Sequence, residues 1–242
     1  MLCYVDDVLS IAVDPAATLR GLQSVVKLKN DKVAEPEVYL GAQLGKIDID
    51  GQPCWTMSAE KYVLASLRNV DESLAKKGLL LPSKCYSPMS TDYHPELDTS
   101  NELKSDGVQY YQELVGILRW AVELGRVDIL LETALMSTHL ALPRVGHLNQ
   151  LYRIFGYLKL YPKRKLAFDA LHPRISEKMF KKHDWYDFYW DVCEAIPPDS
   201  MPKPRGNMMT THCFVDASHG SDHATRRSQT GILIFCNRAP IM

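Results

Sequence analysis

The apolar residues of this chain change their spacing twice, and this change restricts the possible folds more than any other feature. Short β-prone runs occur at 2–13, 37–57 and 211–236, and a polar turn inside each run predicts an antiparallel hairpin. The second run contains Asp50-Gly51, a favoured two-residue turn. In 58–70 and again in 108–160, apolar residues recur every three or four positions, as on one face of a helix, whereas 81–107 is rich in Pro, Ser, Asp and Thr and is expected to form a long loop. Strands at both ends and helices in the middle predict an α+β fold.

The central part of the chain carries signals for where its helices begin and end. Ser58 is a good N-cap for the first helix, and Asp128 is a good N-cap for a later one. The last helix follows Pro143 and ends at Tyr161, because the proline after Tyr161 disfavours helical backbone at that position. We therefore expect a bundle of two or three helices over residues 108–160.

Composition excludes several classes of protein. The chain has 242 residues, of which 46% are hydrophobic and 24% charged, which is typical of folded domains and not of disordered or fibrous chains. It contains no apolar run of the roughly 18 residues that a membrane span needs. Its first residues are acidic where a signal peptide would be basic. The six cysteines are scattered without a CxxC pair, which favours reduced thiols and an intracellular location.

Net charge conceals a strongly basic stretch. The whole chain has a formal charge of −1, yet residues 143–182 contain ten basic residues and two acidic ones. A basic face of this kind can follow a phosphate backbone without reading its sequence. The candidate phosphate contacts are Lys159, Lys163, Arg164 and Lys165. A solvated helix surface explains the same charges equally well, so both interpretations stay open.

The tetrapeptide Tyr4-Val5-Asp6-Asp7 is the most informative motif. Two-residue hairpin turns favour Asn-Gly or Asp-Gly, whereas this turn places two like charges side by side. Adjacent carboxylates are costly unless a cation neutralises them. Mg²⁺ or Mn²⁺ takes oxygen ligands of this type together with substrate phosphates. The motif therefore predicts a divalent metal site at Asp6 and Asp7, and the alternative is an ordinary acidic turn.

The segment LCYVDDVLSI resembles the YxDD catalytic hairpin in the palm of reverse transcriptases, in the form found in copia-type LTR retrotransposons. Further segments resemble the same family in the same order along the chain. In Arg126–Ile129 the family's proline is replaced by Val127. The other matching segments are Val38–Gly41, Trp55–Tyr62, Tyr110–Trp120 and Arg153–Lys159. The order of several independent segments carries more weight than any one motif.

The resemblance assigns roles to individual residues. It implies that Asp6 and Asp7 bind Mg²⁺ during template-directed nucleotidyl transfer, that Tyr4 packs near the primer end, and that Val5 faces the nucleic acid. Gly41 is placed where backbone could approach a primer strand closely, although a β-bulge explains a glycine there equally well.

A further acidic residue follows an apolar run near the C-terminus. The segment around Asp216 is similar to the start of the RNase H domain that follows reverse transcriptase in these elements, which implies that Asp216 is a metal ligand. The plain alternative is that Asp216 caps a strand of a lone hairpin. Nearby histidines and cysteines match no standard zinc spacing, so we do not expect zinc there. These residues are His212, Cys213, His219, His223 and Cys236.

The resemblance divides the chain into four parts. Residues 1–60 are expected to hold the C-terminal part of a reverse transcriptase palm, 61–170 a helical thumb and connection region, 171–208 a linker or insertion, and 209–242 an incomplete RNase H-like hairpin. In the family, a third palm aspartate and the fingers precede the YxDD hairpin. We therefore expect a fragment of a retrotransposon RNA-directed DNA polymerase that is inactive alone.

The expected partners are an RNA template, a DNA primer and their RNA–DNA hybrid, with dNTP in the intact enzyme and the rest of the Pol polyprotein. No membrane is expected to bind, and the expected location is a cytoplasmic retroelement particle or the nucleus. The alternative hypothesis is a noncatalytic, nucleic-acid-binding remnant of a retroelement. A third is an unfolded pseudogene product, whose incomplete palm would expose sheet edges.

Overall fold

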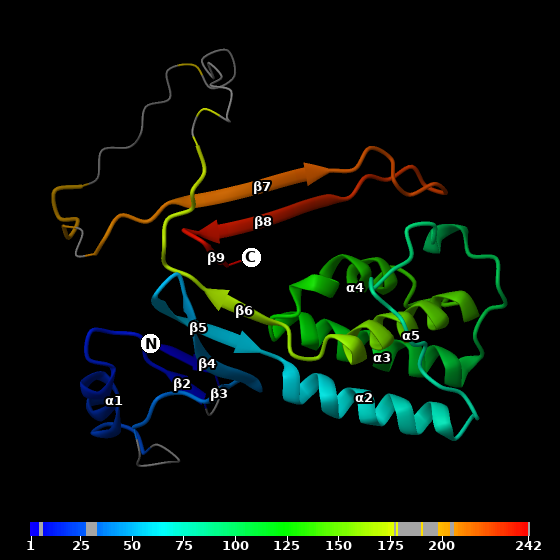
Figure 1. Cartoon of the computed structure of the whole chain (residues 1–242), viewed down its shortest axis with the longest axis horizontal. Helices are drawn as coiled ribbons and strands as arrows, with labels where there is room; N and C mark the ends of the chain where they lie inside the picture. The colour runs from blue at the N-terminus through cyan, green and yellow to red at the C-terminus, as the bar shows by residue number, and fades with distance from the viewer. Residues whose placement is uncertain are drawn as a thin grey trace.

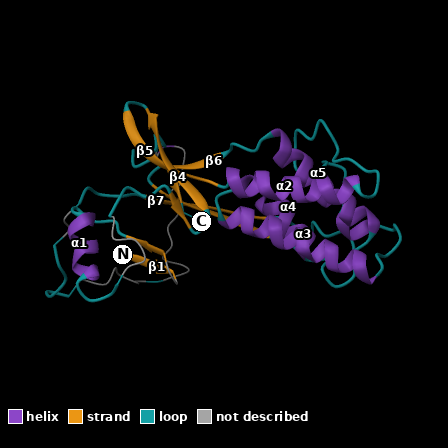
Figure 2. Ribbon diagram, turned by 90° about the horizontal axis from the view of Figure 1, so that it is seen from below, coloured by secondary structure: helices purple, strands orange, loops and turns teal. Residues whose placement is uncertain are grey.

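The computed structural model describes residues 1–4, 7–27, 33–176, 178, 190, 198–203 and 206–241, with backbone alone at 2, 4 and 7. In these residues the chain forms five α-helices and three antiparallel sheets, a mixture of α and β structure. Helices α2 to α5 lie together on one side, and α1 lies at the opposite end of the molecule (Figure 1, Figure 2). No described helix is both long and apolar enough to cross a lipid bilayer.

A four-stranded sheet lies between the two ends, in the order β3-β4-β5-β6. Its long strands β4 and β5 are joined at Asp50-Gly51, where both residues have positive φ (53° and 80°), as a two-residue hairpin turn requires. This confirms the turn predicted from the sequence. The strand β6, which the sequence analysis missed, follows the last helix and pairs with β5. The four strands are Val38–Tyr39, Ala42–Ile49, Gln52–Ser58 and Lys165–Phe168.

The main hydrophobic core is formed by the helices. Helix α2 buries Val63, Leu67 and Val70, on the stripe that the sequence predicted, and it packs against α5 and β4. Each large apolar side chain buried in this way contributes roughly 1.5–3 kcal/mol. Helix α5 ends before Tyr161-Pro162, as expected. The helices are α2 (Glu60–Ala75), α3 (Ser105–Glu123), α4 (Leu130–Ser137) and α5 (Val145–Leu160), with short 3-10 helices η1 (Pro95–Leu97) and η2 (Val127–Ile129).

Two predicted helix caps are wrong. Helix α2 begins at Glu60, one residue later than a Ser58 cap implies, and the Ser58 hydroxyl accepts a hydrogen bond from the Glu60 amide at 3.2 Å. Asp128 lies inside η2 and does not cap α4, which begins at Leu130. The reason is that the Asp128 carboxylate is already bound by the guanidinium of Arg126.

The N-terminal segment forms a hairpin and a helix. Strands β1 (Leu2–Tyr4) and β2 (Asp7–Leu9) pair antiparallel, so the first predicted hairpin is confirmed, although it ends before residue 13. Helix α1 (Pro15–Gln23) was not predicted from the sequence. Its N-terminal signals are clear in retrospect, because Pro15 is its first residue and the Asp14 carboxylate accepts a hydrogen bond from the Ala17 amide at 2.9 Å.

The C-terminal segment forms a three-stranded sheet, so the expectation of a lone hairpin is wrong. Strands β7 (Thr211–Ala217) and β8 (Thr230–Cys236) are followed by β9 (Ala239–Pro240), which pairs with β8. Arg238, just before β9, forms ion pairs with Asp169 at 2.8 Å and with Asp50 at 2.9 Å. These contacts attach the sheet to the end of β6 and to the β4–β5 turn.

The segment 171–208 is described only at 171–176, 178, 190, 198–203 and 206–208, so its role as a linker stays a prediction.

Candidate metal and nucleic-acid sites

The hairpin that carries the paired aspartates has a register one residue away from the expected one. Tyr4 pairs with Asp7, so Asp7 begins strand β2 and does not belong to the turn. Val5 and Asp6 lie outside the described residues, and only the backbone is described at Tyr4 and Asp7. The structure confirms an antiparallel hairpin around the motif, and a metal ion at Asp6 and Asp7 stays a prediction.

Asp216 lies on an exposed part of strand β7, opposite Gly231 of β8. One of its carboxylate oxygens accepts a hydrogen bond from the backbone amide of Ala217 at 2.9 Å. Among the residues that the structure describes, Asp216 joins no group of three metal-ligating side chains. Its role as an RNase H metal ligand therefore stays a prediction.

Gly41 lies in a tight turn between β3 and β4. Tyr39 pairs with Ala42, so Leu40 and Gly41 are the two turn residues, and both have positive φ (51° and 86°). A β-bulge, the alternative interpretation of this glycine, is therefore wrong. A Cβ atom at Gly41 would meet nothing within 4 Å, so backbone conformation and not crowding explains the glycine. Close approach of a primer strand stays a prediction.

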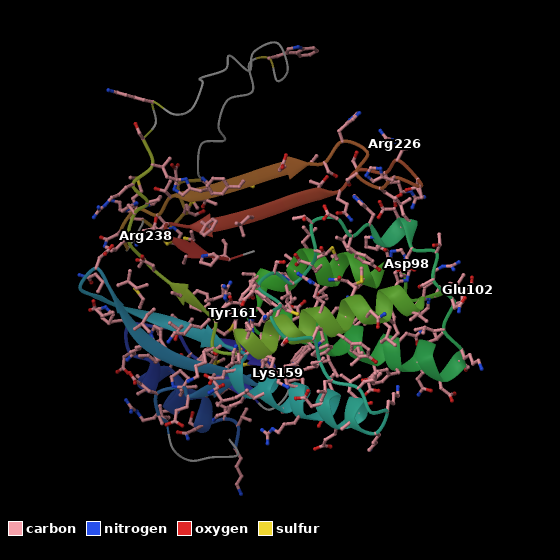
Figure 3. All side chains as sticks on the ribbon, turned by 45° about the vertical axis from the view of Figure 1, so that its right-hand side comes forward. Asp98, Glu102, Lys159, Tyr161, Arg226 and Arg238 are labelled. Atoms are coloured by element: carbon pink, nitrogen blue, oxygen red, sulfur yellow. The ribbon has the colours of Figure 1, made fainter. Side chains whose placement is uncertain are left out.

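The basic cluster divides into two parts, of which the first is held by contacts within the protein. Lys159, in the last turn of α5, forms an ion pair with Asp71 of α2 at 2.7 Å. The guanidinium of Arg164 lies over the ring of Tyr161, 4.7 Å from its centroid, and 3.7 Å from the carboxylate of Asp128. Lys159 and Tyr161 lie close together at this end of the helical group (Figure 3). Both cations therefore contribute to structure, whatever else they bind.

The second part of the cluster consists of Lys163 and Lys165. Both are exposed, and within the described part of the chain neither forms an ion pair. Lys163 lies in the turn between α5 and β6, and Lys165 is the first residue of β6, opposite Ser58. These two lysines are the better candidates for phosphate contacts.

Beneath the basic cluster lies a buried ionic network that the sequence analysis did not identify as a site. The Asp128 carboxylate accepts hydrogen bonds from the fully buried guanidinium of Arg126 and from the hydroxyl of Tyr157, at 2.9 Å each. Burial alone would raise the pKa of Asp128, but hydrogen bonds and positive charge from Arg126, with Tyr157 and Arg164 contributing, lower it overall. Burial and the Asp128 carboxylate raise the pKa of Tyr157 to about 12. The network holds the C-terminal half of α5 against η2.

The structure also brings together His94, Glu96 and His223, which sequence spacing did not connect. Glu96 and His223 are 127 residues apart in the chain, yet the His223 amide donates a hydrogen bond to Glu96 Oε1 at 3.1 Å. Along the sequence, His223 groups only with its neighbours in the C-terminal segment, and no local pattern connects it with His94 and Glu96.

Comparison with known proteins gives one distant relative. The chain is 24% identical, over 238 residues, to the transposon Ty5-1 protein YCL074W of Saccharomyces cerevisiae. The match covers 98% of this chain and 62% of the length of that relative. No family model matches the chain. No solved structure matches it either.

This chain is therefore related to a transposon protein. The match extends over almost the whole chain, so it includes the N-terminal hairpin, the helices and the C-terminal sheet alike. The homology supports a retroelement origin.

Proposed function

We propose that this chain is part of a retroelement reverse transcriptase followed by the start of an RNase H domain. In the intact protein the reaction would be template-directed nucleotidyl transfer with Mg²⁺ or Mn²⁺. The observation that carries the proposal is the antiparallel hairpin formed around Tyr4-Val5-Asp6-Asp7, with Tyr4 paired to Asp7. The distant similarity of nearly the whole chain to a transposon protein supports the same assignment.

Asp6 and Asp7 are the proposed metal ligands. Adjacent carboxylates offer hard oxygen donors, and this donor set fits Mg²⁺ or Mn²⁺ better than a softer metal ion. When bound, the ion would neutralise the negative charge that develops on the reacting phosphates. Asp6 and Asp7 are neighbouring anions in the sequence, and their mutual repulsion favours cation binding even without substrate.

The proposed partner of Lys163 and Lys165, the second part of the basic cluster, is an RNA–DNA hybrid of template and primer. Lys163 and Lys165 project from the junction of α5 and β6 with no internal ion pair among the described residues. Contacts of this type bind phosphate through charge and carry no sequence information. The ionic network of Arg126, Asp128 and Tyr157 would keep this junction in place.

A noncatalytic, hybrid-binding role is the second candidate. It is favoured by the exposure of Lys163 and Lys165, which form no ion pair within the described part of the chain and could bind phosphates without a metal ion. Catalysis by two metal ions requires several carboxylates held together. Under this second proposal the chain would bind hybrid by charge alone.

Two measurements on the full chain separate these candidates. Fluorescence anisotropy with a labelled RNA–DNA primer–template, at several salt concentrations with and without Mg²⁺, measures binding. Primer extension with dNTP and Mg²⁺ measures catalysis, with Asp6→Asn and Asp7→Asn as variants and exposed Asp92→Asn as the matched control. Extension that requires both Asp6 and Asp7 but not Asp92 supports catalysis by this chain. Hybrid binding that strengthens with Mg²⁺ through Asp6 and Asp7 supports the first proposal even when extension is absent. Binding that falls steeply with salt and does not depend on Mg²⁺ supports the noncatalytic role.

A separate double variant tests whether Lys163 and Lys165 bind the hybrid. Replacing Lys163 and Lys165 together with alanine should weaken hybrid binding and reduce the slope of log affinity against log salt by about 2, one unit for each lost phosphate contact. Lys76→Ala with Lys104→Ala removes the same charge from exposed positions elsewhere and should leave the slope closer to the wild-type value. Equal effects of the two double variants would exclude the α5–β6 junction as the binding site.

A further inference from the structure

The loop between β7 and β8 meets the connection that precedes α3, and three potential metal ligands come together there. His94 Nδ1 lies 3.4 Å from Glu96 Oε1, and the ring centroids of His94 and His223 are 4.5 Å apart. One ligand atom from each of the three residues lies within 4.8 Å of the other two. The β7–β8 loop reaches over the helical group in Figure 1, and in Figure 3 its Arg226 lies on the side of the molecule that carries Asp98.

The segment that carries His94 and Glu96 is anchored to helix α5. Its Pro95 carbonyl lies 2.9 Å from Nε2 of His147, a buried side chain of α5. Pro95 is itself buried and begins the short helix η1, so its two neighbours project from one tight turn. The Glu96 side chain is only 14% exposed, which restricts the positions of its carboxylate.

The loop that carries His223 is held by its own hydrogen bonds. The Asp222 carboxylate accepts hydrogen bonds from the amides of Ala224 and Thr225, at 2.9 and 2.6 Å. The Gly220 amide donates to the Ser228 hydroxyl at 3.0 Å, which closes the loop across its base. Two separately ordered segments therefore present the three ligands to one another.

We propose that His94, Glu96 and His223 form a Zn²⁺ site that joins the C-terminal hairpin to the helical part of the chain. Two imidazole nitrogens and one carboxylate, with water as a fourth ligand, are a donor set that zinc favours. Zinc–ligand bonds of about 2.0–2.1 Å place neighbouring ligand atoms of a tetrahedron about 3.3–3.4 Å apart. The separation of His94 Nδ1 from Glu96 Oε1, 3.4 Å, already matches that value.

This zinc site differs in position and chemistry from the proposed magnesium site. Its donors are mainly imidazole nitrogens, which Mg²⁺ binds poorly. It lies at the turn of the β7–β8 hairpin, whereas Asp6 and Asp7 belong to the N-terminal segment. The zinc proposal does not rest on the proposed function, and either can fail without the other.

The test is zinc binding by the full chain, measured by competition with a chromophoric chelator, with the visible spectrum of Co²⁺ as a second probe. We expect one tightly bound Zn²⁺ per chain and a Co²⁺ spectrum typical of tetrahedral coordination. Removing one ligand by His94→Ala, Glu96→Gln or His223→Ala should weaken binding at least about tenfold. The control is His219→Ala, an exposed histidine of the same loop, which should bind as the wild type does.

Glu96→Gln separates zinc binding from loop docking. The amide oxygen of glutamine still accepts the hydrogen bond from the His223 amide, so the loop stays docked while the anionic ligand is lost. In the wild type, Zn²⁺ should slow hydrogen exchange of residues 218–229, and in Glu96→Gln this effect should disappear. Zinc affinity that is equal in the three ligand variants and in His219→Ala would overturn the proposal, and so would exchange in this loop that does not respond to zinc.

Discussion

Asp128 binds the buried guanidinium of Arg126 through two parallel hydrogen bonds, from Nε and from Nη2, each 2.9 Å long. The Arg126 side chain has no exposed surface, and its remaining nitrogen, Nη1, has no hydrogen-bond partner in the part of the chain that the structure describes. The positive charge of Arg126 is therefore balanced mainly by one carboxylate, which is itself held by the Tyr157 hydroxyl. This arrangement makes the pair unusually sensitive to loss of either partner.

Asp128→Asn should lower the free energy of unfolding by about 3 kcal/mol, because it leaves the guanidinium of Arg126 buried without a counter-charge. The measurement is urea unfolding followed by circular dichroism. Asp71→Asn is the matched control, because it breaks the more exposed ion pair with Lys159 and should change stability by less than about 1 kcal/mol. Equal losses in the two variants would show that the buried pair has no special role.

The same pair predicts how stability depends on pH. The pKa of Asp128 in the folded protein lies below its ordinary value of 3.8, because hydrogen bonds and charge from Arg126 outweigh the opposing effect of burial. As pH falls, the unfolded chain takes up the proton first, so the stabilisation is complete above about pH 4 and is lost as pH falls through the folded-state pKa. The stability advantage of the wild type over Asp128→Asn should therefore shrink as the pH falls below about 4. An advantage that stays constant over this range would contradict the ionic explanation.

Two helical glycines should respond oppositely to alanine. At Gly156 in α5, a Cβ atom would lie 2.6 Å from the Pro82 carbonyl oxygen and 2.8 Å from Cys85 Sγ, so Gly156→Ala should destabilise by about 2 kcal/mol. At exposed Gly116 in α3, a Cβ atom would meet nothing within 4 Å, so Gly116→Ala should stabilise by roughly 0.5–1 kcal/mol. Thermal unfolding of both variants tests the prediction, and a gain in stability at Gly156 would show that the Pro82 segment does not pack there.

Arg238→Gln should release the C-terminal sheet from β6. The substitution removes the ion pairs to Asp50 and to Asp169, and the Asp169 side chain is only 5% exposed. Hydrogen exchange should become faster in β7 and β8, while exchange in α3 and α5 stays unchanged. Arg119→Gln, at an exposed position of α3, is the control for loss of one arginine. Unchanged exchange in β7 and β8 would mean that other contacts attach the sheet.

Local sequence signals predicted the elements whose boundaries depend on neighbouring residues. Asp50-Gly51 supplied the two positive φ angles of its turn, and Pro162 ended the last helix at the expected residue. The apolar stripe through Val63 and Leu67 identified the buried face of α2. Each of these outcomes depends on backbone preference or on periodicity within a few residues. Such signals act before any long-range contact has formed.

Asp128 shows where local signals failed. Its residue type favours a helix cap, and its carboxylate would have capped α4 in the absence of stronger donors. The buried guanidinium of Arg126 and the hydroxyl of Tyr157, which comes from another helix, bind that carboxylate instead. Lys159 follows the same rule, because its partner Asp71 lies 88 residues away in the chain. Which partners a charged side chain meets depends on how the elements pack, and the sequence does not display that packing.

The order of residues alone therefore determined the buried face of α2, the Asp50-Gly51 turn and the motif around Asp6 and Asp7, because these depend on spacing along the chain. Only the tertiary structure decided which charges are balanced internally and which remain exposed, as at Lys159 and Lys163. It alone brought His94 and Glu96 to His223. The physical reason is that ionic and metal-ligand contacts require atoms within a few ångströms, and packing of distant segments sets those distances.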